Sequence, residues 1–245
     1  MDGKTKIIQE LEQPLKALNI QLNAKQEEQI CHYYEKLKEW NAVMNLTAIV
    51  DEVDFAQKHV VDSITSAKFY DFSKIDTVID LGTGAGLPGI PLKIVFPHLQ
   101  MTLVDSLNKR INFLNELIDE LGLVDIVAIH GRAEEVGKDP QYREQFDCCV
   151  SRAVSQLAVL SEYCIPFVKV DGCFIAYKSV NTEEEIKDAE YAIETLGATI
   201  HKIEDIDLYS GQMPRRFVFI DKKVNTQERY PRRAGVPQKK PLLKS

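Results

Sequence analysis

The sequence predicts an α/β protein built on a doubly wound sheet of about seven strands, with the last pair antiparallel and a helical segment before it. Three observations support this class. From about residue 75, short β-branched runs alternate with helical segments, with roughly 22 to 26 residues between the centres of successive runs. The last two extended runs follow each other with no helical pattern between them. The preceding residues carry helical periodicity instead.

Residues from about 4 to 70 show the spacing of amphipathic helices. One apolar face is formed by Ile30, Tyr33, Leu37, Trp40 and Met44, and a second by Val53, Ala56, Val60, Ile64 and Ala67. Asn23 is the expected N-cap of the first face's helix, because its side chain can accept amide hydrogens of the first turn. We expect Trp40 to belong to the core rather than to a base-stacking surface, and His59 to be structural rather than a metal ligand.

The expected strands lie between residues 77 and 221. They are Thr77–Leu81, Met101–Asp105, Val124–His130, Asp147–Ser151, Cys173–Lys178, Thr199–Asp205 and Arg216–Asp221. The helix after the second strand has Ser106 as its expected cap, and its apolar side is made by Ile111, Leu114, Ile118 and Leu121. Another helix is expected near Thr182–Leu196. Right-handed crossovers place helices on both faces of such a sheet.

Composition is typical of a cytoplasmic globular protein. Of the 245 residues, 44% are hydrophobic and 27% are charged, and no stretch approaches the roughly 20 apolar residues that span a bilayer. The alternating charges of residues 1–12 do not fit a signal peptide. The five cysteines form no CxxC pair and have no nearby histidine pattern, so we expect neither a disulfide framework nor a metal site.

Charge is distributed unevenly along the chain. The net charge is −7, yet residues 222–245 hold eight Lys or Arg against one Glu, so the rest of the chain is strongly acidic. Three prolines in this tail favour an extended rather than a helical conformation. The tail fits either a solubilising terminus or a contact with nucleic acid. We therefore divide the chain into a helical extension (1–70), an α/β core (71–223) and a basic tail (224–245).

A glycine-rich turn between the first strand and the next helix is the main functional signal. It reads Asp80-Leu81-Gly82-Thr83-Gly84-Ala85-Gly86-Leu87-Pro88-Gly89. Glycines in such a turn allow a sharp bend and the close approach of a ligand. Gly84, Gly86 and Gly89 also match the GxGxxG pattern of dinucleotide sites, so an NAD-dependent oxidoreductase is one alternative.

Two features favour S-adenosylmethionine over a dinucleotide. The carboxylate of Asp80 would repel a pyrophosphate but can attract the amino group of a sulfonium ligand, directly or through water. Pro88 removes an amide donor from the helix start that a pyrophosphate would use. Asp105 ends the second strand and can accept hydrogen bonds from ribose hydroxyls, a device that both cofactor classes use. The predicted cofactor site includes Asp80, Gly82, Gly84, Gly86 and Asp105.

Further segments extend the comparison with known families over nearly the whole chain. The motif Asp80-x-Gly82-x-Gly84-x-Gly86 looks like that of a class I, Rossmann-like methyltransferase. More specific segments are Trp40-Asn41, Asn45-Leu46-Thr47, His59, Asp62-Ser63, Pro88-Gly89-Ile90-Pro91-Leu92, Asp105-Ser106, Lys109-Arg110, Phe113-Leu114, Arg132-Ala133-Glu134, Ser151-Arg152-Ala153, Tyr230-Pro231-Arg232 and Pro241-Leu242. With these segments the chain resembles the bacterial small-subunit ribosomal RNA guanine-N7 methyltransferase family, called RsmG or glucose-inhibited division protein B (GidB).

The resemblance implies methylation of N7 of one guanine in 16S rRNA, with S-adenosyl-L-methionine as cofactor and the small ribosomal subunit as partner. We expect a monomeric enzyme. The cofactor positions that the resemblance carries over are Gly82, Leu87, Asp105, Ala133, Glu134 and Arg152. Leu87 departs from the family, whose members often have Phe there, although an aliphatic side chain can still cover the cofactor by packing.

Charged residues follow several of the expected strands. Because ligands of open α/β sheets bind beyond the carboxyl ends of the strands, we expect one crevice surrounded by Asp80, Asp105, Arg132, Arg152 and Lys178. Arg152 can hold a carboxylate, a flipped base or a phosphate, or instead form a salt bridge to a neighbour such as Asp147. Lys109 and Arg110 lie in a first helical turn, where the helix dipole disfavours cations unless an external anion such as RNA phosphate binds. We assign Arg152 and Lys109 to substrate positioning, with a solvated charged face as the alternative for Lys109.

The expected chemistry needs no general base. The chain lacks the Asn/Asp-Pro-Pro-aromatic run that holds an exocyclic amine after the fourth strand. Cys148 and Cys149 alternate across a buried strand, which favours packing over nucleophilic attack. Guanine N7 has a free lone pair, so alignment with the methyl group can supply the rate. The remaining alternatives are a methyltransferase for protein or a small molecule, and a ribosome- or RNA-binding protein without catalysis.

Overall fold

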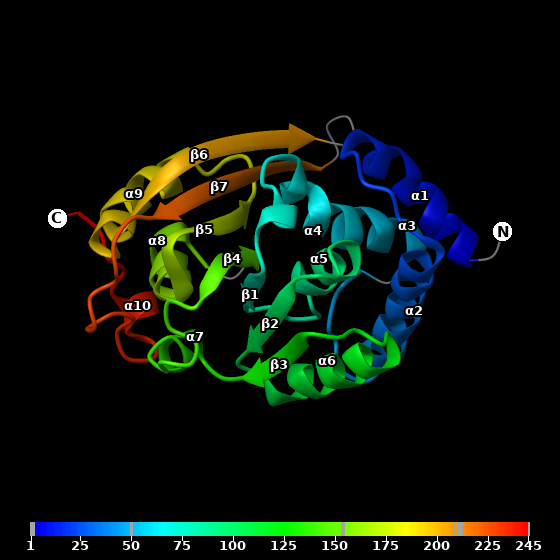
Figure 1. Ribbon diagram of the computed structural model, residues 1–245, viewed down its shortest axis with the longest axis horizontal. Helices are drawn as coiled ribbons and strands as arrows, with labels where there is room; N and C mark the ends of the chain where they lie inside the picture. The colour runs from blue at the N-terminus through cyan, green and yellow to red at the C-terminus, as the bar shows by residue number, and fades with distance from the viewer. Residues whose placement is uncertain (1–2, 50, 153–154, 208, 210–212, 245) are drawn as a thin grey trace.

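The computed structural model describes residues 3–49, 51–152, 155–207, 209 and 213–244. Its centre is a seven-stranded sheet in the order β3-β2-β1-β4-β5-β7-β6 (Figure 1). Strands β1 to β5 are parallel, whereas β7 runs antiparallel to both β5 and β6. The predicted fold class is therefore confirmed, including the antiparallel last pair. The motif residues Ala153 and Val154 lie outside the described part of the chain.

The strands agree with the predicted runs and differ mainly at their beginnings. Their bounds are β1 Thr77–Leu81, β2 Gln100–Asp105, β3 Ile126–His130, β4 Phe146–Arg152, β5 Val168–Lys178, β6 Ala198–Asp207 and β7 Pro214–Lys222. β5 begins at Val168 rather than Cys173, because Asp171 and Gly172 lie inside the strand and not in a turn. Asp171 has a φ of 69°, and the register on β4 shifts between Phe146 and Cys148, as in a β-bulge.

Helices cover both faces of the sheet (Figure 1). Those of the core are α5 Gly89–Val95, α6 Asn108–Glu120, α7 Ala133–Val136, α8 Leu157–Cys164 with a 3₁₀ turn at Ile165–Phe167, and α9 Glu183–Thr195. The apolar side predicted for α6 is buried. Cys148 belongs to the apolar layer under α5 and α6, and Cys149 to the layer under α8 and α9, which confirms that the two thiols face opposite sides. Among the described helices, none is both long and apolar enough to cross a bilayer.

The helical extension contains two long helices and a series of short ones. They are α1 Gly3–Ala17, α2 Ala24–Asn41, α3 Glu52–Asp54, a π-helix at Phe55–Val61, α4 Asp62–Ile64, and 3₁₀ turns at Thr65–Lys68 and Phe72–Lys74. Asn23 caps α2 as predicted: its Oδ1 accepts the Gln26 amide at 3.0 Å, and the Gln26 side chain accepts the Asn23 amide in return. Trp40 packs edge-on against Phe113, with ring centroids 5.7 Å apart, so it belongs to the apolar layer as predicted.

The extension shares one apolar layer with α5, α6 and the sheet. The buried Tyr33 hydroxyl donates to the carbonyl of Ala85 in the glycine turn at 2.6 Å. Lys36 of α2 forms ion pairs with Glu116 and Glu120 of α6 at 2.5 and 2.7 Å. The extension is thereby fixed to the part of the core that carries the glycine turn. The domain boundaries at residues 70 and 223 stay predictions.

The last residues cross the surface near α7 and α8 and include the short helix α10 (Val236–Lys239), as Figure 1 shows. The expectation of an extended rather than helical tail is wrong for these four residues. Pro237 lies in the first turn of α10, where a proline lacks only an amide that would have no partner in the helix. Tyr230 and Pro237 are buried, so this segment packs on the core.

Candidate active site

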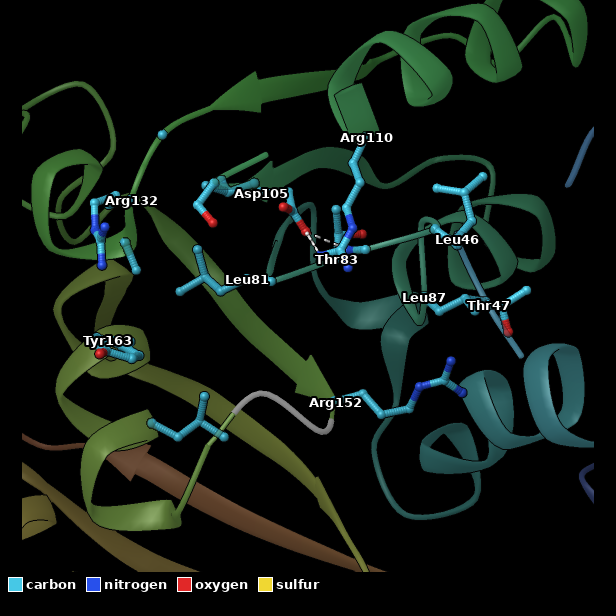
Figure 2. Close-up of a pocket in the computed structure, with 18 of the residues that line it drawn as sticks. Leu46, Thr47, Leu81, Thr83, Leu87, Asp105, Arg110, Arg132, Arg152 and Tyr163 are labelled. Carbon is cyan, nitrogen blue, oxygen red and sulfur yellow. Dashed lines mark hydrogen bonds and ion pairs between the residues drawn. The ribbon is translucent and has the colours of Figure 1, made fainter. Parts of the chain in front are cut away.

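A cavity of about 500 Å³ opens at the carboxyl ends of β1, β2 and β4 (Figure 2). The strand order reverses between β1 and β4, so the loops that follow these two strands diverge and leave a crevice. Six parts of the chain contribute to its walls: the helical extension, the glycine turn, the loop after β2, the loop after β3, the end of β4, and α8. The topology alone therefore brings distant residues to one place.

The glycine turn forms one wall of the cavity. Gly82, Gly84 and Gly86 all have positive φ values, of 71°, 61° and 94°, which glycine adopts without the strain that a side chain brings. Gly82, Gly84 and Leu87 line the cavity as predicted, whereas Gly86 is not among its walls. A Cβ on Gly86 would lie 2.6 Å from the side chain of Ile90, so this glycine allows the turn to pack on α5.

Asp80 lies behind the turn and does not line the cavity. Its side chain is fully buried, and Oδ2 accepts hydrogen bonds from the Thr83 hydroxyl at 2.7 Å and the Gly89 amide at 2.9 Å. Among the described residues, Oδ1 has no hydrogen-bond partner. Burial raises the pKa of Asp80 from 3.8 to about 6. The observed role of Asp80 is to hold the turn, and its predicted contact with a cofactor stays a prediction.

Asp105 ends β2 and its carboxylate lies at the cavity (Figure 2). Oδ2 accepts the Gly84 amide at 2.9 Å and pairs with the Arg110 guanidinium at 3.1 Å, and Oδ1 accepts the Leu107 amide at 2.9 Å. The expected cap, Ser106, does not bond to the first turn of α6. The N-cap residue is Leu107, which has no side-chain cap, and Asp105 accepts the amide of that residue. One carboxylate thus connects the glycine turn to the start of α6.

Arg132, Ala133 and Glu134 follow β3 and line the cavity, as the sequence predicted for all three. The Arg132 side chain is 55% exposed, whereas that of Glu134 is 4% exposed. Glu134 Oε1 accepts the amide of Gly235 at 2.8 Å, so the C-terminal segment supports this wall from outside. The Arg132 guanidinium lies 3.9 Å from the other carboxylate oxygen of Glu134.

Arg152 ends β4 and lines the cavity, and its side chain extends toward the helices of the extension (Figure 2). The alternative of a salt bridge is confirmed, but the partner named for it, Asp147, is wrong. Arg152 Nη1 instead donates to Asp62 of the helical extension at 2.7 Å and to the Lys58 carbonyl at 3.1 Å, whereas Asp147 pairs with Lys169 at 3.0 Å. Asp147 lies at the opposite end of β4, so the pleated strand cannot bring the two side chains together. Arg152 therefore links the core to the extension.

The predicted crevice residues do not all meet. Asp105, Arg132 and Arg152 line the same cavity, but Lys178 lines a neighbouring one that shares only Arg152 and His59 with it. Lys109 lies in the first turn of α6 as predicted, yet it is exposed and outside the cavity. Its role in substrate positioning stays a prediction.

Several cavity residues were assigned no role from the sequence: Leu46, Thr47, Arg110 and Tyr163. His59 also lines the cavity, and its Nε2 lies 2.9 Å from the Thr47 hydroxyl oxygen, so it is a satisfied structural histidine, as expected. Burial lowers the pKa of His59 to about 4, with the Arg152 charge adding to the effect. The family resemblance could have found Leu46, Thr47, His59 and Arg110, which lie in its segments, whereas none of the segments contains Tyr163.

The structure offers no site for a metal ion within its described residues, since no group of three or more His, Cys, Asp or Glu side chains is placed to hold one. The five cysteines are all buried thiols. Burial raises the pKa of Cys148, Cys149 and Cys173 above that of an ordinary thiol. These three thiols are therefore protonated near neutral pH and act in packing.

Residues 26–209 match the family model described as GidB, rRNA small subunit methyltransferase G. The chain belongs to this family. The resemblance seen in the sequence is thereby confirmed. Proteins called ribosomal RNA small subunit methyltransferase G are similar over nearly their full length. That of Brevibacillus brevis is 48% identical, with 94% of this chain and 96% of the relative covered, and that of Bacillus cereus strain B4264 is 47% identical, with 97% and 99% covered.

Solved structures share the fold at much lower sequence identity. The mitomycin 7-O-methyltransferase MmcR matches with a TM-score of 0.55 at 16% identity, over 81% of this chain and 67% of that one. The [4+2]-cyclase SpnF matches with a TM-score of 0.51 at 14% identity, over 67% and 82%. Since a methyltransferase and a cyclase both match, these likenesses establish the Rossmann-like fold, and the activity must be argued from the family and the site.

Proposed function

We propose that this protein transfers the methyl group of S-adenosyl-L-methionine to N7 of a specific guanine in 16S rRNA. The observation that carries the proposal is the cavity formed by the glycine turn and Asp105, in a chain of the rRNA small subunit methyltransferase G family. The enzyme works in the cytoplasm, as a monomer and without a metal ion. Its partner is the small ribosomal subunit or its RNA.

The donor atoms of the cavity fit the cofactor. A carboxylate offers about four acceptor positions, and the three hydrogen bonds to Asp105 leave about one for a ribose hydroxyl. Gly82 and Gly84 present bare backbone, and a Cβ on Gly84 would meet no protein atom closer than 4.0 Å, so space beside it is open to a ligand. Gly82, Leu87, Asp105, Ala133, Glu134 and Arg152 would hold the cofactor, which supplies an electrophilic methyl group.

The titratable groups of the cavity suit an acceptor that loses no proton. His59 is neutral at pH 7, because burial depresses its pKa to about 4, and its Nε2 is engaged by Thr47. The carboxylates of Asp105 and Glu134 are engaged by hydrogen bonds from the protein backbone. Guanine N7 already presents a lone pair, so these residues need only bind and orient the two substrates and exclude water.

Mapping of methylated nucleosides tests the proposal. Purified protein is incubated with isotope-labelled S-adenosylmethionine and either 16S rRNA or small subunits from bacteria that lack this gene, and digested RNA is analysed by mass spectrometry. We expect one labelled 7-methylguanosine. Label in another nucleoside, or none, would contradict the proposal. Calorimetry with S-adenosylhomocysteine and with NAD separates this function from an oxidoreductase, and light scattering tests the monomer.

Two variants divide cofactor binding from RNA turnover. Lys109→Gln should leave the affinity for S-adenosylhomocysteine within a few fold and reduce methyl transfer to RNA at least tenfold. Arg152→Gln alters a residue of the cofactor wall, so it should lower both quantities, but methyl transfer to RNA more than cofactor affinity. Lys109 is exposed beside the cavity, and Arg152 is held at its wall by Asp62. Equal losses of cofactor affinity and turnover in both variants would refute their assignment to substrate positioning.

A further inference from the structure

The C-terminal strap, defined as residues 223–244, begins where β7 ends and is anchored to the core near the start of β4. The Arg143 guanidinium, in the loop before β4, donates to the carbonyl oxygens of Thr226 and Tyr230, each at 2.7 Å. Lys222, at the end of β7, is buried and donates to the Thr226 hydroxyl at 2.7 Å. The strap therefore begins at a fixed point on the amino edge of the parallel strands.

A second group of anchors holds the strap beside the cavity. Arg232 donates from its side chain and its backbone to the carboxylate of Glu162 on α8, with distances of 2.6 to 3.1 Å. The Glu162 side chain is only 1% exposed, so this is a buried carboxylate neutralised by the strap. Three residues later, the amide of Gly235 donates to Glu134, which lines the cavity.

The strap continues along the carboxyl edge of the sheet. The Ser155 hydroxyl, in the loop after β4, donates to Gln238 at 3.0 Å. Leu243 shares a surface hollow with Asn181 and Glu183, which follow β5. Glu134, Ser155 and Asn181 follow three different parallel strands, so the strap lies on the rim at which the cavity opens. Figure 1 shows α10 beside α7 and α8 in agreement with these contacts.

This part of the strap presents unpaired positive charge. Arg233, Lys239 and Lys240 are exposed, and none forms an ion pair with another residue of the described chain. Together with the exposed Arg132 of the cavity wall, we call these four residues the basic rim. Acidic residues of α9 bound it on the side of β5, where Glu183–Glu185 and Asp188 line the hollow beside Leu243. The chain as a whole has a net charge of −7.

We propose that the basic rim is a phosphate-binding surface for the RNA substrate, held in place beside the cavity by the strap's anchors on Glu162 and Glu134. The inference rests on the proposed function and specifies where the RNA backbone lies. An acidic protein repels RNA over most of its surface, so a fixed cluster of cations next to the cavity selects the orientation in which a base can enter. Because the strap is already ordered by its anchors, little chain entropy is lost when RNA binds.

The test is a pair of double variants with the same charge change. Lys239→Gln with Lys240→Gln removes two cations of the basic rim. Lys16→Gln with Lys25→Gln removes two exposed cations of the extension. Lys25 lies next to Gln26, whose side chain bonds to the Ile94 carbonyl at the end of α5, and this end faces the amino edge of the sheet. Affinity for unmodified 16S rRNA is measured at several salt concentrations, together with S-adenosylhomocysteine affinity and thermal unfolding.

The rim variant should bind RNA roughly five- to tenfold more weakly near physiological salt, and its slope of log affinity against log salt should fall by about 1.5 to 2. Its S-adenosylhomocysteine affinity and its melting temperature should match those of wild type, because these two side chains make no contact with the cavity. The extension variant should retain the wild-type slope. Similar slopes for both variants would overturn the inference, as would a loss of cofactor affinity in the rim variant. Wild-type protein that neither binds nor methylates the RNA would refute the proposed function itself.

Discussion

Replacing Asp80 with asparagine tests how the glycine turn is held together. The Asp80 carboxylate is buried, it accepts two hydrogen bonds through Oδ2, and its Oδ1 has no partner among the described residues. The side-chain oxygen of an asparagine at this position can accept the same bonds from Thr83 and Gly89 without carrying a buried charge. We therefore expect Asp80→Asn to stabilise the ligand-free protein while it weakens cofactor binding.

The magnitude follows from the pKa of Asp80, which burial raises from 3.8 to about 6. A difference of this size corresponds to about 3 kcal/mol in the free energy of unfolding at pH 7. Because the folded-state pKa is raised, the charged carboxylate destabilises the protein above about pH 6. This cost disappears as the pH falls toward 3.8 and the folded protein takes up the proton. The gain from Asp80→Asn should therefore be largest near pH 7.5 and small near pH 4.

Urea denaturation of wild type and variant across this pH range measures the effect. The exposed Asp76 just before β1 supplies a control, since Asp76→Asn removes the same charge without removing a buried one. Calorimetry with S-adenosylmethionine should show at least a tenfold loss of affinity for Asp80→Asn, if the carboxylate attracts the cofactor's amino group. A stability difference that stays constant with pH would refute the buried-charge explanation. Unchanged affinity would refute the electrostatic role of Asp80 toward the cofactor.

Three further outcomes are expected. Gly86→Ala should lower the melting temperature much more than Gly84→Ala, because the new Cβ at position 86 would lie 2.6 Å from a neighbouring side chain. Gly84→Ala should mainly reduce cofactor affinity. Arg232→Gln should lower the free energy of unfolding, measured by urea denaturation, by about 2 to 3 kcal/mol, because it leaves the buried Glu162 unpaired. In a protein that already carries Glu162→Gln, the same substitution should cost much less. Burial of neutral His59 should add about 3 kcal/mol to the free energy of unfolding above pH 6.5, and this contribution should be lost as the pH falls toward 4. A stability difference between wild type and His59→Gln that does not change with pH would contradict this.

The fold could be predicted from the sequence because its periodicities are local. The five parallel strands and the apolar side of α6 each follow from residues close together in the sequence, and the glycine turn marks the end of β1. The errors arose where tertiary contacts outweighed local signals. Asp171 and Gly172 look like a turn but continue β5 as an irregularity. The prolines of the strap suggested an extended chain, yet Pro237 starts α10, because a proline is accommodated in the first turn of a helix.

The candidate site could be predicted only where it follows a strand. Strand ends converge by topology, which is why Asp105, Arg132 and Arg152 meet at one cavity. No sequence rule identifies the partner of Arg152 as Asp62, because the two residues are 90 positions apart and belong to different parts of the chain. The same limit applies to Asp80, since the direction in which its side chain turns depends on hydrogen bonds made by residues after the turn.

These long-range partners have a consequence for assembly of the site. The extension supplies Asp62 to Arg152, and the strap supplies the Gly235 amide to Glu134, so two walls of the cavity are held by segments outside the central sheet. A core folded without them would leave the carboxylate of Glu162 without its partner Arg232 and lose the fixed position of Arg152. Unpaired buried charges are expensive, so such a core should relax to a more open cavity. We therefore expect cofactor affinity to depend on the extension and the strap as well as on the central sheet.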